Sequence, residues 1–151
     1  LNQSKPVKLL LSKQLDSTYF LLKKLPLFNF HKRITDTEIV LNPIYFEYNK
    51  SNITQEGAFE LDKLVQVMKS NDKLVILAKS HTDNRGSDAY NLSLSDRRAK
   101  ATVQYVISKG IAKDRISGKG MGEIEPKVDC KEACTEEQHA QNRRSEFLIV
   151  K

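Results

Sequence analysis

The residues of this chain best suited to bind a charged ligand lie in a polar loop at residues 80–86, which contains Asp83. Arg98 follows fifteen residues later, where we expect the first turns of a helix. A carboxylate at a strand end and a guanidinium at the next helix start can face each other across one pocket. Such a pair suits a zwitterion, because the acid takes an ammonium and the arginine takes a carboxylate through two parallel hydrogen bonds. The helix N-terminus favours the same carboxylate.

Two other interpretations of this loop remain open. Asp83 and Arg98 could form a surface ion pair, which contributes little to stability. His81, Asp83 and the neighbouring serines could serve a hydrolase. The sequence contains no Gly-x-Ser-x-Gly elbow, and no second carboxylate is evidently paired with Asp83 for acid–base work. We therefore expect a protein that is not an enzyme, in which His81 hydrogen-bonds the backbone of its loop.

The first half of the domain shows how such a loop would be positioned. Apolar segments at 39–41 and 44–46 predict strands. Thr54 is expected to cap a helix that ends at 71–72. Its apolar face recurs at helical spacing, on Leu61, Leu64, Val65 and Met68. The continuous apolar run at 74–78 predicts a strand buried on both faces, directly before the polar loop.

The second half continues the alternation of strands and helices. Ser93 and Asp96 resemble a capping box at a helix start, and Gly110 is placed for a left-handed helix end. A strand is expected to begin at 115–117, and the last strand at 147–150 follows a short helix or loop. The order predicts an α/β fold, a two-layer sandwich of a small mixed β-sheet with helices on one face.

The positive charge is concentrated at the N-terminus. Residues 1–35 hold seven basic residues and one acidic residue, which accounts for the whole net charge of +6, whereas residues 36–151 hold 18 of each. We expect residues 1–35 to be a basic linker or extension, with a weakly periodic helix at 8–24, and residues 36–151 to be the domain. Because this charge is interleaved with Leu and Phe beside the main domain, we do not expect nucleic-acid binding.

No apolar run reaches the roughly 18 residues of a membrane-spanning helix. The N-terminus has neither an initiator Met nor the pattern of a secretory signal. We expect a mature protein or a fragment of a longer one. No glycine-rich phosphate cradle is present, so no cofactor is expected.

Four motifs in order resemble the OmpA C-terminal-like domain family, which includes the peptidoglycan-associated lipoprotein and flagellar stator subunits. The resemblance spans roughly residues 39–151. It rests on His-Thr-Asp-Asn-Arg-Gly at 81–86, Tyr-Asn-Leu-Ser-Leu-Ser-Asp-Arg-Arg-Ala at 90–99, Lys-Gly-Met-Gly-Glu at 119–123 and Asn-Arg-Arg-Ser-Glu-Phe at 142–147. The family fold is a small α/β sandwich, which agrees with the pattern above.

The resemblance implies a ligand, the meso-diaminopimelate of peptidoglycan stem peptides. Asp83 and Arg98 match the family residues that would hold its ammonium and carboxylate. Further ligand-binding residues implied by the match are Asn91, Thr82, Asn49, Arg143 and Asn142. One departure is Ser80, where the family usually has Gly, which is favoured where φ is positive or the backbone approaches closely.

Cys130 and Cys134 could bind zinc together with His139, but the spacing is irregular and a fourth ligand is not obvious. The oxidising compartment implied by the resemblance favours a disulfide between them, and no metal.

The resemblance therefore implies a non-catalytic peptidoglycan anchor in the periplasm of a Gram-negative bacterium, joined to the outer membrane through a missing upstream region. The alternative is the peptidoglycan-anchoring module of a flagellar motor or stator assembly. The sequence leaves the oligomeric state open, including a homodimer.

Overall fold

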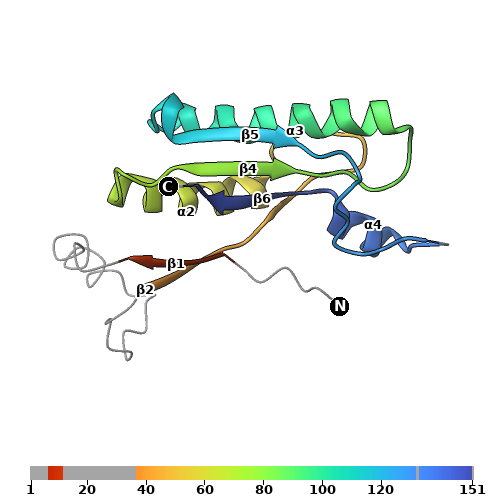
Figure 1. Cartoon of the computed structure of the whole chain (residues 1–151), viewed down its shortest axis with the longest axis horizontal. Coiled ribbons are helices and arrows are strands. Elements are labelled where there is room, and N and C mark those ends of the chain that lie inside the picture. The colour runs from red at the N-terminus through yellow and green to blue at the C-terminus, as the bar shows by residue number, and fades with distance from the viewer. Residues whose placement is uncertain (1–6, 12–36, 132, 151) are drawn as a thin grey trace.

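In the computed structural model, which describes residues 7–11, 37–131 and 133–150, a four-stranded sheet carries helices on one face (Figure 1). The strand order is β3-β6-β4-β5, and only β4 and β5 are parallel, so the sheet is mixed. The strands are β3 (Ile44–Tyr45), β4 (Ile76–Ser80), β5 (Ile116–Gly120) and β6 (Arg144–Ile149). The helices are α2 (Gln55–Ser70), α3 (Asp88–Ser108), the 3-10 turn η1 (Lys113–Arg115) and α4 (Glu136–Asn142). The predicted α/β sandwich is confirmed.

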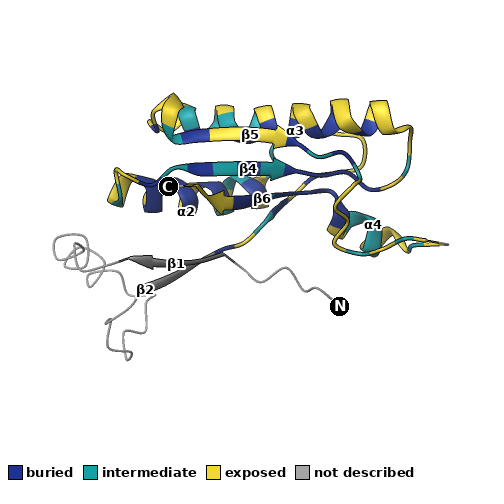
Figure 2. Cartoon of the chain, in the orientation of Figure 1, coloured by how far each residue is buried: buried dark blue, intermediate teal, exposed yellow. Residues whose placement is uncertain are grey.

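Helix α2 forms as its sequence predicts. The side chain of Thr54 accepts a hydrogen bond from the backbone N–H of Gly57, and Asn71 caps the other end. The four apolar residues expected on one face are all buried, and they form the core with residues of β3, β4 and β6. Figure 2 shows buried positions on the sides of α2 and α3 that meet the sheet, and exposed positions on their outer sides.

The strand β4 departs from the prediction. It runs from Ile76 to Ser80, two residues later than the apolar run, and only alternate residues are buried. Leu77 and Lys79, which point to the other face, are partly exposed. The prediction of a strand buried on both faces is therefore wrong, because the helices cover only one face of this sheet.

Helix α3 starts earlier than its capping-box pattern predicts. Ser87 is the N-cap, and its hydroxyl accepts the N–H of Tyr90. Ser93 lies inside the helix, and Asp96 there accepts a hydrogen bond from the backbone of Gly120 at 3.1 Å. Arg98 consequently lies about three turns into the helix. The expectation that it stands in the first turns, near the helix dipole, is wrong.

Glycines let α3 approach β5 closely. A Cβ at Gly118 would lie 2.9 Å from Val103, and one at Gly120 would lie 2.6 Å from the hydroxyl of Ser95. Gly110 has a φ of 99°, which confirms the predicted left-handed helix end.

A separate two-stranded sheet pairs a segment of the N-terminal region with residues just after the predicted boundary. Strand β1 (Val7–Leu11) pairs antiparallel with β2 (Thr37–Leu41). The weak helix predicted from residue 8 is therefore wrong over its first residues, and residues 12–24 lie outside the described part. The domain boundary at 35/36 stays a prediction. No helix in the described segments is both long and apolar enough to cross a membrane.

Candidate ligand-binding site

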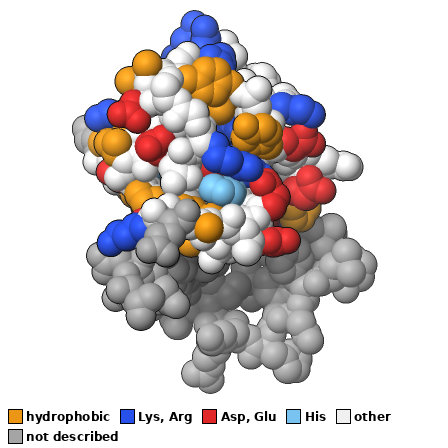
Figure 3. Space-filling model, turned by 90° about the vertical axis from the view of Figure 1, so that its right-hand side faces the viewer, with side chains coloured by type: hydrophobic (Ala, Val, Ile, Leu, Met, Phe, Trp, Pro, Cys, Tyr) orange, Lys and Arg blue, Asp and Glu red, His pale blue; other side chains and the backbone are white. Residues whose placement is uncertain are grey.

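The sheet topology brings three loops together at one end of the strands: the loops after β3 and β4 and the loop before β6. In the antiparallel pairs, Ser80 lies opposite Ser145, and Tyr45 lies opposite Arg144. The loops that leave β3 and β4 therefore emerge where the chain enters β6. Figure 3 looks onto the end of the molecule that carries α4, where acidic and basic side chains lie side by side.

A small pocket lies at this end of the sheet. Six of the seven predicted ligand-binding residues line it: Asn49, Thr82, Asp83, Asn91, Arg98 and Arg143. The residues that sequence reasoning missed are Tyr48, Arg85, Tyr90 and Leu94. Its volume is about 20 Å³, which is room for about one water molecule.

Asp83 is buried and fully paired. One carboxylate oxygen accepts the backbone N–H of Arg85 at 3.1 Å, and the other accepts guanidinium N–H groups from Arg85 at 2.7 Å and Arg143 at 3.3 Å. Burial alone would raise the pKa of Asp83, but the hydrogen bonds from Arg85 lower it below its usual value. The pocket therefore contains a carboxylate that is ionised at neutral pH.

Arg98 is completely buried. Its Nε donates to the carbonyl of Lys50 at 2.9 Å, and its two terminal nitrogens donate to the carbonyls of His81 at 3.0 Å and Glu47 at 3.2 Å. Burial, and then the charge of Arg143, lower the pKa of Arg98 to about 10, so it remains charged at pH 7. Because Asp83 and Arg98 are both buried, the alternative of a surface ion pair does not hold.

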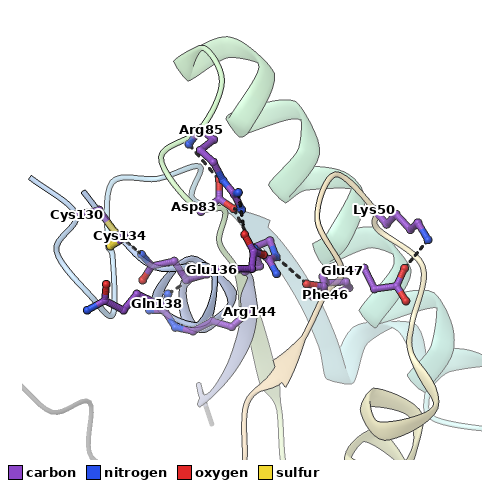
Figure 4. Close-up of polar contacts among 12 residues, drawn as sticks. Phe46, Glu47, Lys50, Asp83, Arg85, Cys130, Cys134, Glu136, Gln138 and Arg144 are labelled. Atoms are coloured by element: carbon purple, nitrogen blue, oxygen red, sulfur yellow. Dashed lines mark hydrogen bonds and ion pairs between the residues drawn. A yellow bond between two sulfur atoms is a disulfide. The ribbon is translucent and has the colours of Figure 1, made fainter. Parts of the chain in front are cut away.

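Arg85 and Arg143 are joined by a shared glutamate at the start of α4. The carboxylate of Glu136 lies 2.9 Å from each guanidinium, and Figure 4 shows it beside Asp83 and Arg85. Arg143 also donates to the carbonyl of Phe46 at 3.0 Å. Arg85 additionally lies over the ring of Tyr48, 4.4 Å from its centroid. Hydrogen bonding to Asp83, which is the largest effect, raises the pKa of Arg85.

Three polar residues complete the pocket wall. Asn49 adopts a left-handed φ of 59°, which Asn tolerates, and it accepts a hydrogen bond from Tyr90. The amide of Asn91 donates to Glu123. The hydroxyl of Thr82 is buried and has no hydrogen-bond partner among the described residues. A buried polar group of this kind is unfavourable unless a partner binds it.

Asn142 lies outside the pocket lining. Its side-chain oxygen accepts the backbone N–H groups of Lys127 at 2.8 Å and Val128 at 2.9 Å, and its amide donates to the carbonyl of Val128. These bonds hold the loop that precedes Cys130. The structure thus gives Asn142 a role in positioning this loop and does not bring it to the pocket.

The expected disulfide between Cys130 and Cys134 is confirmed. His139 lies close enough for its ring nitrogen and both sulfurs to fall within 4.8 Å of one another, but the sulfurs are bonded to each other. The backbone carbonyl of Cys130 accepts a hydrogen bond from Asn84 at 3.2 Å. The disulfide loop therefore packs against the pocket loop.

The two residues before Thr82 differ from expectation. The ring nitrogens of His81 have no hydrogen-bond partner in the described part of the chain, so the predicted side-chain bond to the loop backbone is wrong. Its main-chain groups bond Arg144 and Arg98 instead. Ser80 has no positive φ, and its hydroxyl bonds that of Ser145 across the sheet. Serine in place of glycine is therefore accommodated here.

A larger hollow of about 840 Å³ lies beside β3 and the start of α2. It shares only Arg143 with the polar pocket, and its other lining residues include Tyr45, Phe59 and Glu60. Because the converging charges lie in the smaller pocket, we regard the smaller pocket as the candidate binding site.

The chain folds as a small α/β sandwich with a polar pocket at one end of its sheet. The sequence model of the OmpA family matches residues 45–143, and the chain belongs to that family. Outer membrane protein A of Bordetella avium is 40% identical over 106 residues, which cover 70% of this chain and 53% of that protein. The chain thus spans about half the length of this curated relative.

Solved structures share the fold. The peptidoglycan-associated lipoprotein of Burkholderia pseudomallei has a TM-score of 0.66 at 27% identity, over 71% of this chain and 88% of that one. The C-terminal domain of Helicobacter pylori MotB also has a TM-score of 0.66, over 73% and 84% of the two chains. Its identity is 18%, so this second likeness shows the fold alone.

Proposed function

We propose that this domain binds peptidoglycan without altering it, through the diaminopimelate of the stem peptide. The observation that carries the proposal is the convergence of one ionised carboxylate, Asp83, with three guanidinium groups in one pocket. Diaminopimelate offers the complementary charges, an ammonium and a carboxylate on the same carbon. A zwitterion can exchange bonds with both kinds of group, whereas a neutral or singly charged ligand matches only one of them.

Each end of the zwitterion has a natural partner. The ammonium would bond the carboxylate of Asp83, while Arg143 and Arg98 would face the ligand carboxylate. The unpartnered hydroxyl of Thr82 is available for a remaining polar group, and Asn91, whose amide donates to Glu123, lines the same pocket. None of these assignments requires a nucleophile, which supports binding without catalysis.

The whole protein would anchor the outer membrane to the cell wall from the periplasm of a Gram-negative bacterium. The relatives named outer membrane protein A, and a structural neighbour named peptidoglycan-associated lipoprotein, support this role. The stator alternative has weaker support, because the MotB likeness extends only to the fold.

The test uses Asp83→Asn. Arg98→Ala is less suitable, because it would also leave three backbone carbonyls without a donor and so destabilise the fold. We expect Asp83→Asn to weaken binding of a stem peptide containing diaminopimelate about ten- to a hundredfold, from a charge-assisted bond of about 1.5–3 kcal/mol. Calorimetric titration measures this affinity. Asp88→Asn is the matched control, since it removes one exposed charge from the start of α3.

A lysine-containing stem peptide provides the second comparison, because it has the amine but lacks the paired carboxylate. We expect it to bind at least tenfold more weakly. Equal affinity for the two peptides would contradict the proposed recognition of diaminopimelate. Chromatography of the peptide and of muropeptides after incubation should recover them intact, and cleavage would contradict a binding-only role.

A further inference from the structure

Arg85 occupies the side of Asp83 that a ligand's ammonium would need. Its backbone N–H holds one carboxylate oxygen and its guanidinium holds the other, at 3.1 and 2.7 Å. With Arg143 also bonded to the second oxygen, both oxygens of Asp83 are already engaged. A ligand cation must therefore compete with a bond that the protein makes to itself.

Arg85 can leave Asp83 without losing all its partners. Its other terminal nitrogen bonds Glu136 at 2.9 Å, and its guanidinium lies over the ring of Tyr48. The side chain of Arg85 is 33% exposed, whereas that of Arg143 is 8% exposed. Arg143 is also tied to the carbonyl of Phe46. Of these two arginines, Arg85 is the one placed to move.

Displacing one wall of this small pocket would give a ligand more room. The pocket holds about 20 Å³, and Arg85 is one of its walls. Figure 4 shows Arg85 beside Asp83, with Glu136 near both. The Arg85 guanidinium can rotate outward while it keeps its contacts with Glu136 and Tyr48. This rotation would both enlarge the pocket and free one side of Asp83.

We infer that Arg85 is a gate: its guanidinium takes the place of the ligand's ammonium on Asp83 and swings out when the ligand binds. This inference rests on the proposed function and adds its regulation. The gate keeps a buried carboxylate paired in the empty site, at a cost to ligand affinity. It also imposes selectivity, because only a cation able to replace the guanidinium bond can displace it.

The test is Arg85→Gln, titrated calorimetrically with a stem tripeptide ending in meso-diaminopimelate. Glutamine keeps the backbone N–H bond to Asp83 and removes the competing charge. We expect binding to tighten about tenfold, which is about 1.4 kcal/mol. Lys100→Gln is the matched control, since it removes an equal charge from an exposed position on α3 and should leave affinity unchanged.

A second probe separates a gate from a general effect on the pocket. When the side-chain amine of the tripeptide is acetylated, nothing competes with Arg85 for Asp83, so Arg85→Gln should give no gain. If wild type binds the unmodified tripeptide and Arg85→Gln binds it equally well or more weakly, the gate is overturned and the proposed function is not. An equal gain with the acetylated probe would also overturn it. If neither protein binds the unmodified tripeptide, the proposed function fails and the gate fails with it.

Discussion

The imidazole of His81 is a buried titratable group directly before the pocket residues Thr82 and Asp83. Burial, and then the charge of Arg144, lower its pKa from 6.5 to about 4. The folded protein therefore holds His81 neutral at a pH where the unfolded chain protonates it. Above pH 6.5 both states are neutral and this effect vanishes, while below pH 6.5 protonation favours the unfolded state.

We expect the free energy of unfolding to fall by about 2 kcal/mol between pH 7 and pH 5 because of His81. Asp83 affects stability only at lower pH. Its stabilising contribution is lost as the pH falls through the pKa of Asp83 in the folded state, which lies below 3.8. Urea denaturation at the two pH values measures the change. His81→Gln should flatten the dependence and His139→Gln should not. A wild type equally stable at both pH values would contradict the assignment.

At the scale of elements, a helix starts where a side-chain hydroxyl accepts a free backbone N–H, and more than one serine near the start of α3 could take that role. The motif at 93–96 predicts a start there, and Ser87 offers the same hydroxyl six residues earlier. The structure places the N-cap at Ser87, and Asp96 bonds Gly120 on β5. A contact between residues 24 positions apart has no local sequence signature.

Ser87→Ala should therefore destabilise the protein by about 1 kcal/mol, because the N–H of Tyr90 loses its acceptor. Ser93→Ala, at an exposed helix position, should change stability by less than about 0.5 kcal/mol. Thermal or urea denaturation of both variants measures the difference. If Ser93→Ala proved the more harmful change, the helix start placed at Ser87 would be wrong.

At the scale of the whole molecule, periodicity and the four motifs were enough to predict the sandwich, the order of its main elements and six residues that share the pocket. They could not predict how those residues are bonded. Arg98 donates to backbone carbonyls of residues 17 to 51 positions away. Arg85 bonds the carboxylate of Asp83, which the motifs predict to face a ligand. The motif at 142–147 predicts Asn142 for the site together with Arg143, but the side chain of Asn142 bonds the loop before the disulfide.

The N-terminal region gives the last prediction. Every pocket residue and the whole family match lie within residues 45–143, so a chain beginning at Thr35 should fold and bind the stem peptide within about twofold of the full chain. It loses β1 but keeps Leu41, whose side chain is part of the core.

A chain beginning at Asn42 is the informative comparison, because it also removes Leu41. We expect that chain to lose about 2–3 kcal/mol of stability, as for burial of one large aliphatic side chain. Denaturation curves and titrations of both shortened chains provide the measurements. If the chain beginning at Thr35 fails to fold, β1 belongs to the domain and the boundary at residue 35 is wrong. Binding equal to wild type with reduced stability only in the chain from Asn42 would place the edge of the folding unit at β2.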